Sequence, residues 1–372
     1  MKSNYKSIGE LVERIDERNR DGSITTLIGV SIDKKFIPSV ANVIGTDLTS
    51  YKVIRKYDFA VSLMQVSRDE KIPVACQKEY DVAIMSPAYP IFRVKDENEI
   101  LPEYLEMWFM RSEFDREASF VAVGGVRGSM PWEEFAKLKL PVPDIEVQKD
   151  IVSSYRAVTD RIALKKQIND NLEEQLITLF KEKILDNEEL IEVEPLDSNI
   201  SFINGLAMQN FRPEENETYF PVIKIRELSQ GFCDSNSEFC TDKIDESHII
   251  DEGDLVFSWS GSLQAAFWTS HRAGLNQHLF KVESEIYPRW YVYLWVKHHL
   301  LNFQRIAENK GTTFGHIKRE DLHSAMIKVV DNSKIAMLSV VFEPILSSCL
   351  NNAAEIHRLA DVQKVLLAQL SR

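Results

Sequence analysis

The sequence predicts an α+β fold with two pseudo-repeated globular α/β domains, separated by two long helices that pack as an antiparallel coiled coil. The first observation is a repeat, because Pro102–Trp108 (PEYLEMW) returns as Pro288–Leu294 (PRWYVYL). The second is that each copy leads through a glycine loop into a long helical stretch. The third is a constant offset of 187 residues between these stretches, so the repeated unit is half of the chain.

The boundaries follow from these features. We expect the first globular domain at 1–143, a central long helix at 144–187, the second globular domain at 188–332 and a C-terminal long helix at 333–372. A chain of 372 residues is long enough for a separate core in each globular domain.

Each globular domain has short alternating strands before its helix. Asp58–Ser62 precedes Tyr89–Val94 in the first domain, and Asp254–Ser258 precedes Gln277–Val282 in the second. Aromatic and β-branched residues favour strands, and the neighbouring Asp and Gly residues favour turns. These segments predict a small sheet in each domain.

A helix and a glycine loop follow the strands in both copies. Pro102 and Pro288 suit the first turn of a helix, where a missing N–H costs little. The loops are 124–129 (GGVRGS) and 310–316 (KGTTFGH). Glycine lets a backbone approach another surface closely, while the Arg, Lys, Ser and Thr side chains can donate hydrogen bonds to phosphates or base edges.

The long helices carry apolar residues in alternating steps of four and three, which is the spacing of a coiled-coil seam. The two seams interrupt their apolar pattern at the same place, with Lys165 in the first and Asn352 in the second. A polar residue in a seam often fixes register and partner. We therefore expect the two helices to pair antiparallel, although packing of each helix only on its own domain is the alternative. The predicted helix–helix seam consists of Ile151, Tyr155, Val158, Ile162, Leu172, Leu176, Leu179, Leu338, Phe342, Ile345, Ile356, Leu359 and Leu366.

The net charge of −13 runs against nucleic-acid binding, for which a basic surface is usual. Its distribution weakens this objection, because 144–197 alone holds 14 acidic and seven basic side chains. Leu255–Val282 has no Asp or Glu yet contains His271, Arg272, His278 and Lys281. Residues 309–319 are also free of acid and contain Lys310, His316, Lys318 and Arg319. Such stretches can present positive potential to phosphates, although buried strands also exclude carboxylates.

We find no catalytic machinery in the sequence. The four cysteines lack metal-ligand spacing, which favours free buried thiols. Ser86–Tyr89 (SPAY) is similar to the Pro-Pro-aromatic loop of amino-methyltransferases, but alanine replaces the second proline, so we expect an ordinary turn. No phosphate-binding loop of the Gly-Lys-Ser/Thr type occurs. We also expect no signal peptide and no apolar run long enough to span a bilayer, which places the protein in the cytoplasm.

Taken in order, several segments resemble the specificity subunits of type I restriction–modification enzymes over nearly the whole chain. The opening 5–12 (YKSIGELV), the junction 132–148 with its Glu146-Val147-Gln148, and 203–207 (INGLA) with 220–225 (FPVIKI) carry the resemblance. The second junction, 328–333 (KVVDNS), departs from the pattern because it lacks the prolines and the Glu-x-Gln of the first.

The resemblance implies that the two globular domains are target-recognition domains, each reading one half of a split double-stranded DNA sequence. It also implies that the helices set the gap between the halves and dock two copies of a methyltransferase (modification) subunit, with restriction or translocase subunits as further partners. The chain itself would be non-catalytic and bind no cofactor or metal, while S-adenosylmethionine would bind the partner.

Acid-poor loops supply the DNA-binding candidates, since Arg and Lys suit guanine or phosphate and Gln can pair with adenine. In the first domain these are Lys34, Lys35, Arg55, Lys56, Gln65, Arg68, Arg127 and Ser129. In the second they are Trp259, Ser260, Ser262, Gln264, Arg272, Lys310, Thr312, Thr313 and Lys318. Any one of them could instead be a solvated surface group, and Trp259 could be part of the core.

Two other function classes compete with this interpretation. An acidic, non-catalytic scaffold could use the same architecture to bridge partner proteins without reading DNA. A stand-alone methyltransferase or nuclease would need a cofactor loop or an acidic metal cluster, which we do not find in the sequence.

Overall fold

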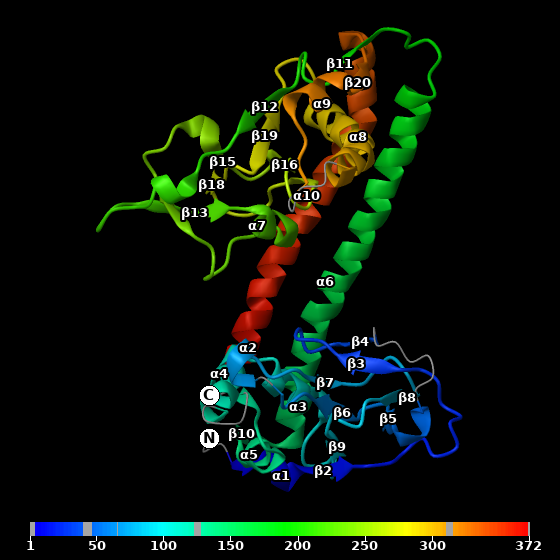
Figure 1. Ribbon diagram of the computed structural model, residues 1–372, viewed down its shortest axis with the longest axis vertical. Helices are drawn as coiled ribbons and strands as arrows, with labels where there is room; N and C mark the ends of the chain where they lie inside the picture. The colour runs from blue at the N-terminus through cyan, green and yellow to red at the C-terminus, as the bar shows by residue number, and fades with distance from the viewer. Residues whose placement is uncertain (1–3, 40–46, 65, 123–127, 310–314, 371–372) are drawn as a thin grey trace. The chain divides into compact units, whose positions relative to one another are not determined.

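The computed structural model describes residues 4–39, 47–64, 66–122, 128–309 and 315–370. The chain divides into two compact units (Figure 1). Unit 1 contains residues 1–160 and 361–372, and unit 2 contains residues 161–360. Both units mix helices and sheets, in agreement with the α+β prediction.

Unit 1 is built around a four-stranded antiparallel sheet in the order β2 (Val12–Ile15), β9 (Ile91–Val94), β6 (Phe59–Val61) and β7 (Val74–Cys76). Three two-stranded ribbons accompany it: β1 (Tyr5–Ser7) with β10 (Lys139–Pro141), β3 (Ile28–Val30) with β4 (Phe36–Pro38), and β5 (Lys52–Arg55) with β8 (Val82–Met85). The helices are α1 (Ile8–Leu11), η1 (Leu48–Ser50), α2 (Val66–Asp69), α3 (Pro102–Phe109), α4 (Ser112–Val121), α5 (Trp132–Lys137) and the start of α6 (Ile145–Phe180).

Unit 2 has two four-stranded sheets. One has the order β12 (Ser201–Asn204), β19 (Leu279–Glu283), β16 (Leu255–Ser258) and β17 (Ala265–Phe267). The other has the order β14 (Phe239–Thr241), β13 (Tyr219–Ile223), β18 (Ala273–Leu275) and β15 (Ile249–Ile250). A ribbon of β11 (Val193–Pro195) and β20 (Met326–Lys328) is also present. The helical segments are η3 (Lys181–Leu185), η4 (Met208–Asn210), α7 (Ile225–Gln230), η5 (Glu246–His248), α8 (Arg289–Asn309), α9 (Arg319–Ser324) and α10 (Asn332–Gln369), the last of which continues into unit 1.

Aromatic side chains form the core of each unit. In unit 1 the Phe59 and Phe92 rings stack at 5.2 Å between centroids, and Phe109 meets both edge-on. In unit 2 the Trp290 ring of α8 stacks on Phe342 of α10 at 4.2 Å. Each such ring buries 150–250 Å², roughly, so these clusters dominate the stability of their units.

The repeat seen in the sequence recurs in individual hydrogen bonds. In unit 1 the Tyr104 hydroxyl donates to the Pro141 carbonyl at 3.2 Å, and in unit 2 the Tyr291 hydroxyl donates to the Lys328 carbonyl, with both residues shifted by 187 positions. A backbone hydrogen bond also repeats, because Val142 N–H donates to Asn4 and Val329 N–H donates to Glu192, with donors 187 and acceptors 188 positions apart. The two units are therefore built on one plan.

These hydrogen bonds correct one detail of the sequence alignment. Matching Pro102 with Pro288 implies an offset of 186, whereas Tyr104 and Tyr291 are 187 apart. Pro102 is the first residue of α3, but Pro288 precedes α8, which begins at Arg289. Proline suits both positions because neither needs a backbone N–H.

The long helices contribute an antiparallel pair within unit 2. Arg161 pairs with Glu355, Lys165 Nζ donates to Asn352 Oδ1 at 2.7 Å, and Asn169 Nδ2 donates to the Cys349 carbonyl at 2.9 Å. The partner number falls as the α6 number rises, which defines the antiparallel direction. Every predicted seam position on both helices is buried or half-buried.

The segments of the same helices that belong to unit 1 also lie together. Gln363 Nε2 donates to Thr159 Oγ1 at 2.8 Å. Leu367 of α10 and Leu370, which directly follows that helix, join the apolar cluster that contains Ile151 and Tyr155 of α6. Leu366, the predicted seam residue that precedes Leu367 in the sequence, is half-buried.

The two junctions into the long helices differ as their sequences do. Gln148 is fully buried, and its amide donates to the Glu99 and Pro143 carbonyls at 2.8 Å while accepting from Leu101 N–H at 3.0 Å. The position 187 residues later is Ile335, which joins the apolar core of unit 2. The second junction thus replaces a hydrogen-bonded amide by hydrophobic packing.

The expectation of no membrane-length apolar stretch was wrong. By length and composition α10 could cross a bilayer, although a single such helix is weak evidence for a membrane span. Glu343 and Pro344 interrupt the stretch and conceal it in the sequence. Leu338, Phe342 and Leu346 of this stretch are buried in the core of unit 2.

Candidate nucleic-acid interface

The predicted contact residue Lys34 is buried in unit 1. Its backbone has a φ of +59°, and its ammonium group lies 2.8 Å from the Asp115 carboxylate and donates to the Phe109 carbonyl. Burial lowers the pKa of Lys34, partly offset by the nearby Asp115 charge. Because its charge is paired inside the unit, Lys34 supports the fold in this conformation rather than presenting a free cation.

The other described candidates of unit 1 lie at or near the surface. The Arg55 guanidinium pairs with Glu17 at 2.6 Å, and Arg68 pairs with its neighbour Asp69 at 2.8 Å. Lys56 lies over the Tyr57 ring, and Lys35 is exposed. Ser129 is half-buried, whereas Gln65 and Arg127 fall outside the described residues. Exposed pairs of this kind are weak, so phosphates could compete for these cations.

In unit 2 two predicted candidates serve internal contacts. Gln264 Nε2 donates to the Ile225 carbonyl at 3.2 Å and to Ser229 Oγ at 2.6 Å. Arg272 pairs with Glu246 and Asp251 and lies over the Phe220 ring. Both side chains therefore hold neighbouring segments together. Ser262 and Lys318 are exposed, whereas Lys310, Thr312 and Thr313 fall outside the described residues.

Two predicted residues, Trp259 and Ser260, belong to a cluster with two histidines. The Trp259 ring lies 6.1 Å from that of His278 and 6.4 Å from that of His316. Ser260 Oγ is 3.0 Å from His278 Nδ1. Ile317 N–H donates to the Trp259 carbonyl at 3.0 Å, so the segments around 259 and 316 are paired. In the sequence His278 and His316 were visible only as members of acid-free stretches.

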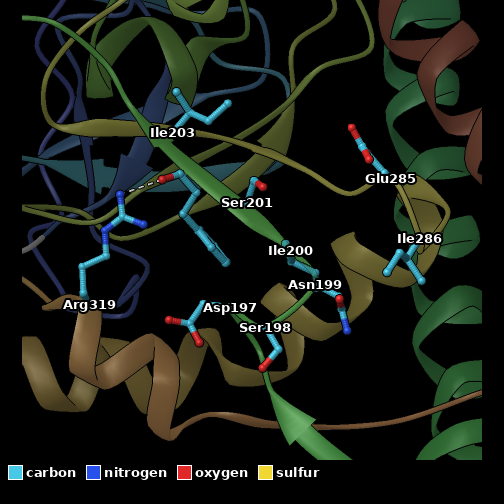
Figure 2. A pocket seen from close by; sticks show the side chains of 10 residues that line it. Asp197, Ser198, Asn199, Ile200, Ser201, Ile203, Glu285, Ile286 and Arg319 are labelled. Carbon is cyan, nitrogen blue, oxygen red and sulfur yellow. Dashed lines mark hydrogen bonds between the residues drawn. The ribbon is translucent and has the colours of Figure 1, made fainter.

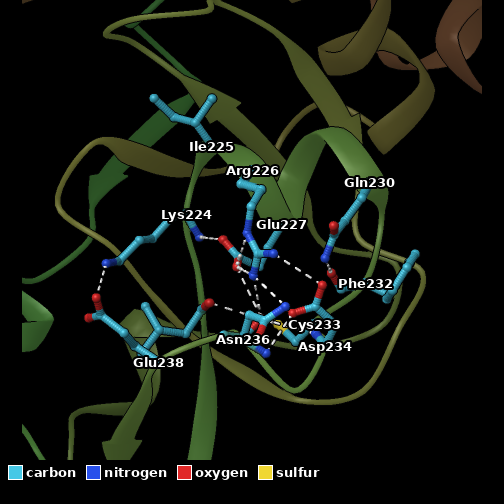
Figure 3. Close-up of polar contacts among 12 residues, drawn as sticks. Lys224, Ile225, Arg226, Glu227, Gln230, Phe232, Cys233, Asp234, Asn236 and Glu238 are labelled. Carbon is cyan, nitrogen blue, oxygen red and sulfur yellow. Dashed lines mark hydrogen bonds and ion pairs between the residues drawn. The ribbon is translucent and has the colours of Figure 1, made fainter. Parts of the chain in front are cut away.

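A polar network beside α7 was missed in the sequence (Figure 3). Glu227 is buried, and it accepts hydrogen bonds from Ser237 Oγ at 3.0 Å and from Lys224 N–H at 3.1 Å. Arg226 donates hydrogen bonds to both Glu227 and Asp234, and its hydrogen bond to the Asp234 carboxylate is the main reason why the Arg226 pKa is raised. Lys224 and Glu227 have the spacing of a helix-capping box. This spacing was the signal in the sequence that could have revealed the network. This network orders the 224–238 segment and neutralises its cations.

A groove of about 470 Å³ in unit 2 lies along the edge strand β12 (Figure 2). Arg319 donates to the Phe202 carbonyl at 2.7 Å and lies over the Phe280 ring. Asp197 and Glu285 also line the groove. Among the described residues that line the groove, the one cation, Arg319, is matched by two acids, so the groove does not resemble a phosphate site.

The described residues include no group of three or more His, Cys, Asp or Glu side chains placed to hold a metal ion. All four cysteines are free thiols, as the sequence predicts. Burial raises their pKa, to about 12 for Cys233 and about 11 for Cys349. Thiolate chemistry at neutral pH is therefore unfavourable at these sites.

Known proteins resemble this chain in sequence. A family described as type I restriction modification DNA specificity domain matches residues 72–174. The type I restriction enzyme MjaIX specificity subunit of Methanocaldococcus jannaschii is 22% identical over 297 residues, which cover 73% of this chain and 68% of that protein. The EcoBI specificity subunit of Escherichia coli is 20% identical over 171 residues, 45% of this chain and 35% of that protein.

The fold is also shared. The crystal structure of a type I restriction–modification system S subunit from M. genitalium aligns with a TM-score of 0.57 at 12% identity, covering 100% of this chain and 97% of that one. At this level of identity the likeness concerns the fold alone. It agrees with the fold class predicted from the repeat and the long helices.

Proposed function

We propose that this chain, a type I restriction–modification specificity subunit by sequence and fold, recognises a split DNA target, with one half read by each unit. The main support for the proposal is that individual hydrogen bonds of one unit recur in the other, such as Tyr104 to Pro141 in unit 1 and Tyr291 to Lys328 in unit 2. Two units with one backbone plan but different surface side chains suit two different half-sequences.

The proposal includes a division of labour within a larger complex. The chain acts as a non-catalytic subunit, and S-adenosylmethionine binds a modification subunit, of which two copies dock on this chain in the cytoplasm. Restriction or translocase subunits join through that complex. This division is compatible with the net charge of −13, since only the surfaces that face DNA need positive potential.

The alternative of an acidic scaffold that bridges partners without reading DNA is not favoured. The family that matches residues 72–174 is described as a DNA specificity domain, and the relatives are specificity subunits. The scaffold alternative predicts partner binding without any sequence dependence.

Sequence-resolved DNA methylation tests the proposal. A host would express the modification subunit with and without this chain. We expect a split motif that is methylated only when the chain is present, and the gap in the motif would report the spacing between the two half-sites. Methylation that is unchanged by the chain, in a complex shown to assemble, would contradict the proposal.

DNA binding by the assembled enzyme, measured at several salt concentrations, tests the two glycine loops. We expect Arg127→Ala or Lys310→Ala to weaken DNA binding by the assembled enzyme while the complex stays intact. Losing one phosphate contact should also lower the slope of affinity against salt by about one. Unchanged affinity in both variants would remove the loops from the proposed interface.

A further inference from the structure

The turn between β18 and β19, residues 276–278, is fixed by its surroundings from three directions. Asn276 N–H donates to the Ile223 carbonyl at 3.1 Å, and Gln277 N–H donates to the Leu206 carbonyl at 2.8 Å. Trp259 N–H donates to the His278 carbonyl at 3.3 Å. The backbone of this turn is therefore held by β13, by the segment after β12 and by the end of β16.

A glycine is required for this arrangement. A Cβ atom on Gly205 would lie 2.2 Å from the Asn276 carbonyl oxygen and 2.3 Å from that of Leu275. Both contacts are with backbone atoms, which cannot move aside as a flexible side chain could. The close approach at Gly205 thus fixes where the turn lies.

The side chains on this rigid turn remain available. His278 is exposed, and its Nδ1 lies 3.0 Å from the hydroxyl of Ser260, which is 7% exposed. Within the part of the chain that the structure describes, the only polar contact of the Gln277 carboxamide is with His278 Nε2, at 3.4 Å. An exposed imidazole oriented by a buried hydroxyl and an amide with spare hydrogen-bonding capacity are preorganised to bind a ligand.

Unit 1 has a turn at the equivalent place. Val61 N–H donates to the Pro90 carbonyl at 3.1 Å, as Trp259 does to His278. The following strands match as well, because Phe59 pairs with Phe92 and Phe257 pairs with Phe280. By this register Tyr89 and Pro90 occupy the positions of Gln277 and His278, and both are half-buried. The two equivalent backbone positions thus carry an amide and an imidazole in unit 2 but a phenol ring and a proline in unit 1.

We propose that the 276–278 turn is a base-reading element of unit 2, in which Gln277 and His278 contact base edges in one half of the DNA target. This inference rests on the proposed function and names residues for it. The difference between the two turns fits two halves of different sequence, since the base edges that a side chain can read depend on its hydrogen-bonding groups.

The chemistry of Gln277 makes the inference specific. A glutamine carboxamide can form two hydrogen bonds with adenine, one to N6 and one to N7, whereas a glutamate accepts from cytosine N4. His278 can donate or accept through Nε2, depending on its tautomer. A turn that served only to connect two strands would have no effect on base preference.

The test uses the chain assembled with its modification subunit and sequence-resolved methylation. We expect Gln277→Ala and His278→Ala to lower the preference for the cognate base roughly 10-fold at one or two positions of a single half-site. At the DNA position where Gln277→Ala weakens the base preference, Gln277→Glu should shift that preference from adenine towards cytosine. Gln167→Ala and His323→Ala, exposed residues elsewhere in unit 2, serve as matched controls and should leave the motif unchanged.

The outcomes separate the inference from the proposed function. If the parent chain directs methylation of a split DNA motif, and both Gln277 variants and His278→Ala direct methylation of the same motif, the inference is overturned and the proposed function is not. A uniform loss of methylation at all positions, with the complex still co-purifying, would also overturn it, because a base contact acts at its own position. The absence of any split motif with the parent chain would overturn the proposed function itself.

Discussion

Lys165 Nζ donates a hydrogen bond to Asn352 Oδ1 at 2.7 Å, and the two residues are 187 positions apart, which is the offset of the repeat. When two helices with repeated sequences pack antiparallel, a residue of one helix faces the equivalent residue of the other at only one point along the pair. That point is occupied here by polar residues, because Asn352 Nδ2 also donates to Asn169 Oδ1 at 2.9 Å. Glu355 accepts from Lys165 at 2.9 Å and completes the group.

We expect Asn352→Ala to destabilise unit 2 by about 1–3 kcal/mol, since Lys165 and Asn169 each lose a hydrogen bond in a half-buried seam. Urea denaturation followed by circular dichroism would measure the change. Asn351→Ala is the matched control, because Asn351 is exposed on the same helix. Equal effects of the two substitutions would show that the polar group contributes no stability.

The stacked pair of Trp290 and Phe342 predicts a larger effect. Phe342→Ala should cost about 3–5 kcal/mol, because it opens a cavity against a ring 4.2 Å away and removes a side chain that is 1% exposed. Val341→Ala on the exposed side of the same turn should change the free energy of unfolding by less than about 0.5 kcal/mol. Thermal denaturation would compare them, and similar losses would contradict the assigned packing.

The first junction depends on Gln148. We expect Gln148→Ala to destabilise unit 1 by about 2–4 kcal/mol, since it leaves Leu101 N–H and two carbonyls without a buried partner. Lys149→Ala, which alters an exposed neighbour, is the control. Hydrogen exchange at Leu101 N–H offers a second measurement, and continued protection in Gln148→Ala would count against this role.

The contact between α6 and α8 predicts a pH dependence. Burial tends to raise the pKa of Glu173, but hydrogen bonds from Lys297 and Tyr293 outweigh it, and the pKa is lowered overall. The Glu173 contribution to stability is therefore present above the ordinary glutamate pKa of 4.5 and is lost as the pH falls through the lower folded value.

Unfolding measured between about pH 6 and pH 3 would test this dependence. The parent chain should lose more stability over this range than Glu173→Gln, which cannot change its charge. Parallel curves for the two proteins would show that Glu173 contributes no pH dependence.

Much of the fold could be predicted from local patterns. The alternating steps of the seam, the strands that contain Phe59 and Phe257, and the offset of 187 are properties of residues close in sequence or of a direct repeat. Helical and strand periodicities need no knowledge of distant partners. The proline alignment failed by one residue because proline is tolerated both inside the first turn and just before it.

The candidate site was less accessible to prediction. Lys34, Gln264 and Arg272 have the side-chain chemistry of DNA contacts, but their partners are Asp115, Ser229 and Glu246, which are distant in sequence. Whether a cation is free depends on where such acids and carbonyls come to lie. Composition alone cannot supply that information.

The sequence by itself determined the repeat, the helical seam with its matched polar positions and the class of fold, because these depend on periodicity and on residue types at fixed spacing. Tertiary structure alone decided which polar side chains are used internally and which remain available. It also brought Gly205, Ser260 and His278, spread over 74 positions, around one rigid turn. Hydrogen bonding and close packing act over a few ångströms in space, whatever the separation along the chain.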